Sequence, residues 1–239
     1  MAKPKPCRRF KAFGGLCPKK NNPPPFPPHH NSVGYQYVAN NLAGFIQQLA
    51  VGYLARGYLF YVCGEIPAGK DPGKTDQKLL AQYGIARSKH QRYRRKLAGM
   101  ANIQYLRWGR FFVLLATHGK HPFFEGEGKS IKDFRETPLK VGGYSVGYRK
   151  GQGKWHPSVR IELNRYRELK AYFLGIAVHR SVENLVQEFQ KLDFEPYAPV
   201  RGQLFSILRA VNRARKAAGF ETISYEIIQR NRKPVRVFQ

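Results

Sequence analysis

Residues 77–124 contain no Asp or Glu, although they carry ten lysine and arginine residues. Tyrosine, tryptophan and phenylalanine residues are interleaved with these cations. Cations at this density repel one another unless an anion outside the chain compensates them. A polyanion with regularly spaced phosphates would do so, because lysine and arginine bind phosphate oxygens. The stretch therefore implies a nucleic-acid partner.

The overall charge balance points the same way. The chain has 239 residues, with 42 Lys and Arg against 15 Asp and Glu, which gives a formal net charge of +27. Such a balance favours nucleic acid over an acidic protein or a membrane surface. No apolar run is as long as a membrane span, and the first ten residues lack the apolar segment of a signal peptide. We therefore expect no membrane partner, and a location in the cytoplasm or on the nucleoid.

The sequence contains no strong catalytic motif. It has no phosphate-binding glycine loop of the GxxxxGK[ST] type, no nucleophile elbow and no close pair of cysteines. His118 and His121, followed by Tyr166 and Lys170, resemble the residue set of the HUH endonucleases. That resemblance implies a replication initiator or transposase that nicks single-stranded DNA with a tyrosine, while two histidines hold a divalent metal.

Two interpretations of these four residues remain open. The HUH family places its histidines two apart on a strand, whereas His118 and His121 are three apart and face opposite sides if the strand continues. Under the other interpretation the histidines are solvated loop residues near phosphate, and Tyr166 packs on the core. The histidine spacing favours this second interpretation, under which the protein needs no cofactor.

Residues 1–34 are predicted to be a disordered basic arm. They carry seven lysine and arginine residues, many prolines and no acid. Cys7, Cys17, His29 and His30 are the residue types of a Cys2His2 zinc site, but the two cysteines are ten residues apart and no helical pattern presents the histidines. We therefore expect no zinc site here.

Residues 35–124 are predicted to form a domain that resembles a winged helix-turn-helix. The expected elements are, in order, a helix over 38–55, a strand over 58–63, a helix from Thr75 or Asp76 to Tyr83, a helix over 89–98, and strands over 102–107 and 110–116. In winged-helix proteins the second short helix enters the DNA major groove, and the hairpin lies against the backbone or minor groove. The resemblance rests on the order of the elements.

The helix over residues 89–98 is the predicted DNA-reading element. Ser88 and Gln91 have the spacing of a capping box, which indicates where the helix begins. Tyr93 and Leu97, together with Met100, recur at the helical period and are expected to pack under the preceding helix.

The cations and Gln91 are then left to face outward. Gln91, Arg92 and Arg95 have the side chains that bond adenine and guanine edges. Arg107 and Arg110 flank the tip of the hairpin and are expected to clamp phosphates. The full set of candidate nucleic-acid-binding residues is Arg87, Lys89, Gln91, Arg92, Arg94, Arg95, Lys96, Arg107, Arg110 and Lys120.

Residues 125–228 are expected to form an α+β region. The expected elements are strands over 140–148 and 158–163, helices over 166–176, 182–192 and 200–218, and a strand over 222–228. Between residues 162 and 195 six acids nearly balance five cations. Such a surface suits contact with protein, including self-association through residues 165–192. Residues 229–239 are a second basic tail.

Together these patterns predict an α+β protein with a winged helix-turn-helix-like core, additional strands and a C-terminal helical region. The expected function is sequence-influenced or structure-selective binding of duplex DNA, in replication, transposition or regulation. A nicking endonuclease is one alternative. An RNA-binding or ribosome-associated protein is another, because aromatic residues among arginines suit stacking on unpaired bases. The helix-turn-helix pattern favours DNA over RNA.

Overall fold

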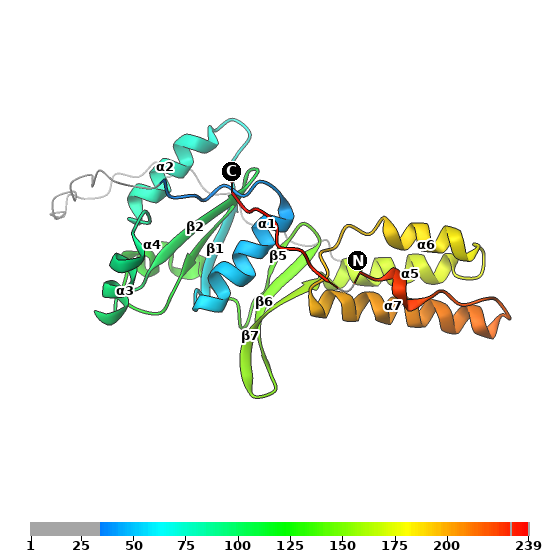
Figure 1. Ribbon diagram of the computed structural model, residues 1–239. Coiled ribbons are helices and arrows are strands. Elements are labelled where there is room, and N and C mark those ends of the chain that lie inside the picture. The colour runs from blue at the N-terminus through cyan, green and yellow to red at the C-terminus, as the bar shows by residue number, and fades with distance from the viewer. Residues whose placement is uncertain (1–33, 230, 239) are drawn as a thin grey trace.

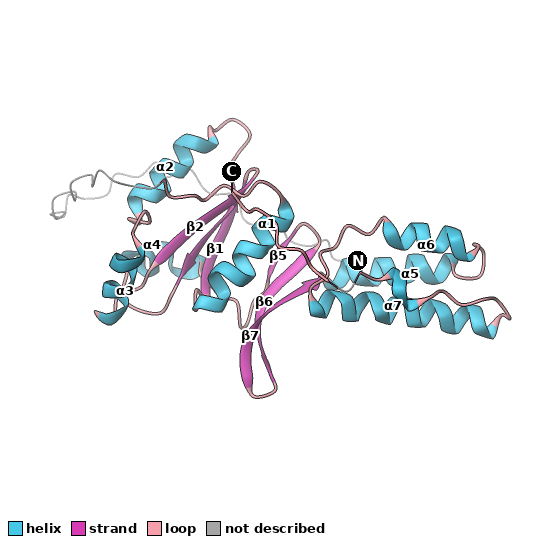
Figure 2. Cartoon of the chain, viewed as in Figure 1, coloured by secondary structure: helices cyan, strands magenta, loops and turns pink. Residues whose placement is uncertain are grey.

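The computed structural model describes residues 34–229 and 231–238. It contains both helices and antiparallel sheets, which confirms the predicted α+β class. Figure 1 shows an elongated molecule, with a first sheet toward one end, a second sheet in the middle and the helices of residues 163–217 at the other end. Figure 2 shows the same arrangement by secondary structure.

The first sheet separates two hydrophobic cores. Its strands are β1 (Phe60–Glu65), β2 (Ile103–Trp108), β3 (Phe111–Ala116) and β4 (Lys132–Asp133), in the order β2-β3-β1-β4 and all antiparallel. Alternate side chains point to opposite faces, so Tyr61 and Val113 join the larger core while Val62 and Phe112 join the smaller one. The strands β2 and β3 form the predicted hairpin, with Gly109 at its tip at a φ of 57°.

One continuous helical segment precedes this sheet, as its apolar stripe predicts. It begins as α1 (Leu42–Gln47), continues as the π-helical turn η1 (Gln48–Tyr53) and ends as the 3-10 turn η2 (Leu54–Arg56). Asn41 caps the segment, because its side-chain oxygen accepts a hydrogen bond from the Gly44 N–H at 2.8 Å. Phe45, Ile46 and Leu49 are completely buried in the larger core.

The helix α2 (Pro72–Gln82) begins earlier than predicted. Its N-cap is Asp71, whose carboxylate accepts a hydrogen bond from the Gly73 N–H at 2.8 Å. The predicted caps, Thr75 and Asp76, lie within the helix. The prediction was wrong because Pro72 and Gly73 resemble turn residues, whereas proline also suits the first position of a helix.

Asp76 is completely buried and joins α2 to the first sheet. Its Oδ1 accepts a hydrogen bond from the Tyr105 hydroxyl at 2.6 Å, and its Oδ2 lies 2.9 Å from Arg107 Nη2. Burial and the Asp76 carboxylate raise the pKa of Tyr105, so its hydroxyl keeps the donated proton. Arg107 is therefore neutralised inside the protein, which corrects its predicted role as a phosphate clamp.

The helix α3 (Lys89–Leu97) has the predicted capping box but packs differently from the prediction. Tyr93 and Leu97 are 64% and 70% exposed, and none of the side chains of α3 is buried. Their predicted packing under the preceding helix is therefore wrong, and a winged-helix core is not confirmed.

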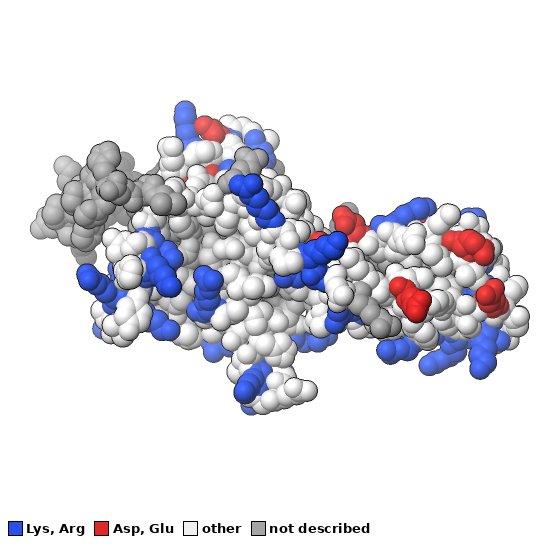
Figure 3. All heavy atoms as spheres, in the orientation of Figure 1, with Lys and Arg blue, Asp and Glu red and all other residues white. Residues whose placement is uncertain are grey.

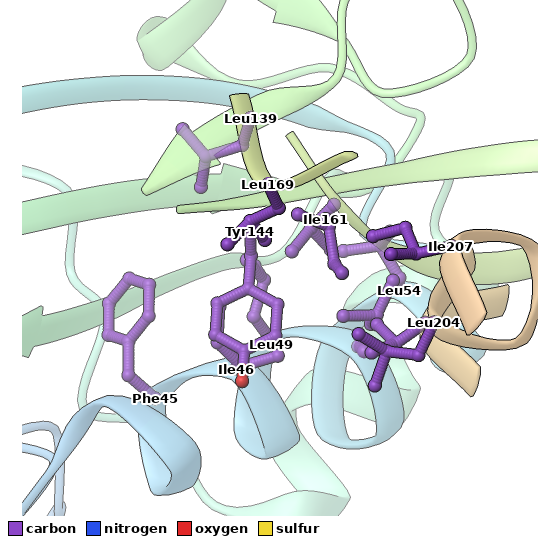
Figure 4. Close-up of a cluster of buried hydrophobic side chains, with 14 of the residues drawn as sticks. Phe45, Ile46, Leu49, Leu54, Leu139, Tyr144, Ile161, Leu169, Leu204 and Ile207 are labelled. Atoms are coloured by element: carbon purple, nitrogen blue, oxygen red, sulfur yellow. The ribbon is translucent and has the colours of Figure 1, made fainter. Parts of the chain in front are cut away.

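The second sheet connects the first sheet to the helical end. It consists of β5 (Leu139–Val141), β6 (Tyr144–Gly151) and β7 (Lys154–Ile161), in that order. The remaining helices are α4 (Pro122–Glu127), η3 (Gly128–Ser130), α5 (Leu163–Ile176), α6 (Val182–Gln190), α7 (Ala198–Ala217) and η4 (Tyr225–Ile227). Side chains of the α1–η2 segment, the second sheet, α5 and α7 meet in the larger core, as Figure 4 shows.

The residues after α7 do not form the strand predicted over residues 222–228. The Asn212 side chain donates a hydrogen bond to the Ile223 carbonyl and accepts one from the Ile223 N–H, both at 2.8 Å. These bonds occupy the main-chain groups that a strand would use for pairing. The segment instead turns through η4.

Residues 231–238 lie along α1. The Gln47 side chain donates a hydrogen bond to the Val235 carbonyl at 2.8 Å and accepts one from its N–H at 3.1 Å. The Asn40 N–H bonds the Val237 carbonyl at 3.0 Å. The predicted basic tail is thus bound to the first helix over this range.

Replacement of Asp76 with alanine should lower the free energy of unfolding by about 3–5 kcal/mol, because it leaves the half-buried Arg107 without its anion and the buried Tyr105 hydroxyl without its acceptor. Asp71→Ala removes a carboxylate from the start of the same helix and should cost only about 1 kcal/mol. Urea unfolding followed by circular dichroism measures both losses. Equal losses in the two variants would refute the role assigned to Asp76.

Candidate nucleic-acid interface

The cations of α3 lie on the surface without carboxylate partners. Lys89, Arg94 and Lys96 are exposed, and the ion pairs among residues 34–229 and 231–238 do not involve α3. On the face shown in Figure 3, the region of α3 carries Lys and Arg spheres without Asp or Glu among them. The positive charge predicted from the sequence is therefore present and uncompensated on this helix.

Two arginines of α3 turn toward the body of the protein, although they were predicted to face outward. Arg92 donates a hydrogen bond to the Arg87 carbonyl, and Arg95 Nη2 donates one to the Ala101 carbonyl at 3.0 Å. Burial and the nearby Arg87 lower the pKa of Arg95. The carbonyls that flank α3 need donors, and arginine is long enough to reach them. The exposure of Tyr93 follows from this packing.

Two other candidate residues have internal partners. The Gln91 Oε1 accepts a hydrogen bond from the Ser88 N–H at 2.9 Å, so the amide predicted to bind a base serves the helix cap. The guanidinium of Arg110 donates hydrogen bonds at 2.6–3.3 Å to the carbonyls of Ile66, Pro67, Ala68 and Lys70. Arg110 therefore holds the loop after β1 rather than clamping phosphate at the hairpin tip.

A cleft with a volume of about 1030 Å³ opens beside α3. It lies between α3, the η1–η2 turns and the first sheet, and its lining includes no carboxylate. The lining cations are Arg56, Lys89, Arg92 and Lys96, the tyrosines are Tyr35, Tyr53, Tyr58 and Tyr93, and the amides are Gln36, Gln48, Asn102 and Gln104. The cleft is therefore positively charged, aromatic and able to form hydrogen bonds.

Gln104 fixes the floor of this cleft. Its Oε1 accepts a hydrogen bond from the Tyr35 hydroxyl at 2.8 Å, and its Nε2 donates one to the Tyr58 hydroxyl at 3.3 Å. Burial raises the pKa of both Tyr35 and Tyr53, so these phenols stay neutral. The charge of the cleft is consequently set by its lysine and arginine residues.

His118 and His121 lie after β3 in different surroundings. His118 is exposed, lines the cleft and packs its ring edge-on against Phe60, with 4.7 Å between ring centroids. His121 is half-buried and caps α4, because its Nδ1 accepts a hydrogen bond from the Phe123 N–H at 3.1 Å. The exposed His118 fits the interpretation as a solvated loop residue, whereas the half-buried His121, which caps a helix, does not.

Tyr166 and Lys170, the other residues of the nicking alternative, belong to α5. The Tyr166 hydroxyl donates a hydrogen bond to Ser206 Oγ at 3.2 Å, and its ring packs against the larger core. No hydrogen bond or ring contact in the described part of the chain joins Tyr166 to either histidine. The structure does not bring the predicted catalytic set together.

A metal site is likewise not found in the part of the chain that the structure describes. No group of three His, Cys, Asp or Glu side chains there is arranged to hold an ion. The described residues do not include the four candidate zinc ligands, which are Cys7, Cys17, His29 and His30.

The β6–β7 hairpin is a basic surface that the sequence interpretation missed. Figure 1 shows it projecting from the body. Arg149, Lys150 and Lys154 are exposed near its tip, and the half-exposed Trp155 stacks on Tyr148 with 5.8 Å between ring centroids. The sequence does indicate this surface, because residues 137–161 form a second stretch without Asp or Glu.

The arrangement thus offers unpaired cations, an exposed tyrosine and buried amides within one region of the surface. Comparison with protein-family models, curated proteins and solved structures finds no match for this chain. None of the helices in the described residues is both long and apolar enough to cross a bilayer. The function is therefore inferred from the chemistry of the interface.

His121 provides a test of the packing beside the interface. Burial, together with the nearby Arg95 and Arg87, lowers its pKa from 6.5 to about 4. The unfolded chain therefore binds a proton more readily than the folded chain between these two values. The free energy of unfolding should consequently fall as the pH is lowered from about 6.5 toward 4. His121→Asn keeps an acceptor for the cap of α4 but does not titrate.

Urea unfolding at pH 7 and pH 4.5 measures this effect. The wild type should lose on the order of 1–3 kcal/mol more than His121→Asn between the two pH values. His90→Asn, a matched change at an exposed position of α3, should retain the pH dependence of the wild type. The same pH dependence in wild type and His121→Asn would show that the buried imidazole is not responsible.

Proposed function

We propose that the protein binds DNA through the exposed cations of α3 and the cleft beside them. The observation that carries this proposal is the exposure of Lys89, Arg94 and Lys96 on one short helix without carboxylate partners in the described residues. Such cations repel one another in the free protein. Phosphates relieve that repulsion, and binding also releases the counterions of the nucleic acid.

The dimensions and the order of the elements support DNA as the ligand. An α-helix with its side chains is about 10–12 Å across, and the DNA major groove, which is about 12 Å wide, admits such a helix. The helix is the second of two consecutive short helices and precedes a hairpin, which is the order found in DNA-binding helix-turn-helix proteins. The deep, narrow major groove of duplex RNA does not admit a helix in this way.

The β6–β7 hairpin supports a second contact with phosphates. Its exposed cations have no ion pair in the described residues. Burial and the neighbouring Arg149 lower the pKa of Arg160, so like charges are crowded on this hairpin. A polyanion would relieve this repulsion as it does on α3.

The combined variant Lys89→Ala, Arg94→Ala and Lys96→Ala should weaken binding to a 30-base-pair duplex by about tenfold or more in 0.1 M salt. The slope of log K against log salt should fall in magnitude by about 2–3, since each lost phosphate contact removes about 0.9. Fluorescence anisotropy over a range of salt concentrations measures both quantities. None of the three side chains is buried, so the fold should be retained.

A matched control removes three exposed cations from the near-neutral helices, by Arg165→Ala, Arg167→Ala and Lys191→Ala. This control should bind duplex DNA within about threefold of the wild type, because it loses only long-range attraction. Equal losses of DNA affinity in the two triple variants would show that α3 is not part of the interface. Tighter binding to RNA than to DNA at equal salt would replace DNA by RNA as the ligand.

The hairpin can be tested separately. Lys150→Ala combined with Lys154→Ala should weaken duplex binding by about three- to tenfold and lower the salt slope by about 1–2. The loss should add to that of the α3 variant, because the two sites share no contact. An unchanged affinity, measured in the same anisotropy assay, would limit the interface to α3 and the cleft.

A further inference from the structure

One side of α3 forms a wall of the cleft. Lys89, Arg92, Tyr93 and Lys96 line the cleft, and their spacing of three, four and seven residues places them on one helix face. Tyr93 is 64% exposed on this wall. A large aromatic ring that remains exposed between cations is suited to stack on a base whose phosphates the cations bind.

Asn102 provides an unused hydrogen-bond acceptor at the floor of the cleft. Its side chain lines the cleft and is only 6% exposed. Its Nδ2 donates a hydrogen bond to the Arg92 carbonyl at 2.9 Å. Because a carbonyl only accepts, this bond identifies the other amide atom as Oδ1.

The Oδ1 of Asn102 is buried and has no hydrogen-bond donor among the described residues. A buried acceptor without a donor costs about 1–3 kcal/mol. The remaining amide of the floor, Gln104, has both of its polar atoms bonded to tyrosine hydroxyls. Asn102 Oδ1 has almost no accessible surface, so the exposed side chains of the wall, rather than this amide, contact a ligand.

We propose that this cleft binds an unpaired nucleotide of a nucleic-acid strand. The base stacks on Tyr93, while Lys89 and Lys96 bind the flanking phosphates. The volume of about 1030 Å³ is at the upper end of the usual range for small-molecule sites and accommodates a nucleotide. This inference deepens the proposed function and depends on it.

The chemistry of the cleft selects an unpaired strand over a duplex. Inside a duplex both faces of a base are stacked on its neighbours, so the ring of Tyr93 cannot stack on them. Every base has an aromatic face that can stack on a tyrosine ring. The cleft should therefore bind single strands of mixed sequence with weak base preference.

The experiment compares Tyr93→Ala with Leu97→Ala in the full chain. Leu97 is equally exposed on the same helix but does not line the cleft, so it is a matched control. Fluorescence anisotropy measures binding to a 12-nucleotide DNA strand, an RNA strand of the same sequence and the corresponding DNA duplex. Tyr93→Ala should weaken strand binding by about 5- to 100-fold, the range expected for one lost base stack, and change duplex binding less than about twofold. Tyr93→Phe should restore strand binding.

A second readout reports stacking directly. A strand with 2-aminopurine at its centre should lose fluorescence on binding the wild type and Leu97→Ala, but not on binding Tyr93→Ala. If binding of either the DNA or the RNA strand depends on Tyr93, the result supports the cleft as the binding site. The strand that binds more tightly then identifies the ligand as DNA or RNA. Equal effects of Tyr93→Ala on strand and duplex, or no effect on the strand, would overturn the inference. Failure of the proposed function would differ, because the α3 cation variant would then bind every nucleic acid as the wild type does.

Discussion

Hydrogen bonds from arginine side chains to main-chain carbonyls hold the loops of this protein in place. With 42 Lys and Arg against 15 Asp and Glu, most guanidinium groups have no carboxylate to meet. Arg95 bonds the carbonyl after α3, and Arg110 bonds the loop after β1. Arg215, which is only 3% exposed, bonds the carbonyls of Ala177 and Arg180 at 2.7 and 2.8 Å. A carbonyl satisfies the donor without cancelling its charge, so the folded protein keeps most of its positive charge.

This constraint also explains where the sequence predicted the structure correctly and where it did not. The capping box of Ser88 and the apolar stripe of residues 38–55 involve only local spacing, and both are present. Arg92 and Tyr93 were assigned to the wrong sides because apolar periodicity assumes that arginine prefers water. That assumption fails when partly buried carbonyls at both ends of a short helix need donors. The buried position of Asp76 was missed for a related reason, since its partners lie about thirty residues further along the chain.

The sequence predicted the positive charge of the candidate interface but not the cleft that this charge lines. The acid-free stretch identified α3 correctly as a basic helix, because charge is a property of composition. The cleft is assembled from residues between Tyr35 and His118, and no local pattern shows that they meet. One partial signal existed, since Asn102 and Gln104 have the spacing that places two amides on the same face of a strand. This spacing alone does not show that α3 lies opposite the two amides and closes the cleft above them.

The side chains of α3 divide the work of binding between different chemistries. Arg92 and Arg95 each bond a main-chain carbonyl of the segments that flank the helix, so one donor of each is used before any ligand arrives. Lys89 and Lys96 keep flexible charges that can follow a phosphate backbone, and Tyr93 between them offers a flat ring at little cost in conformational entropy. The helix α3 is held by hydrogen bonds of Arg92, Arg95 and Asn102 and buries none of its own side chains. Its exposed aromatic residue, Tyr93, is then free to contact a base. The low acid content of the chain, which leaves arginine to bond carbonyls, is thus connected to the ability of the cleft to bind a nucleotide.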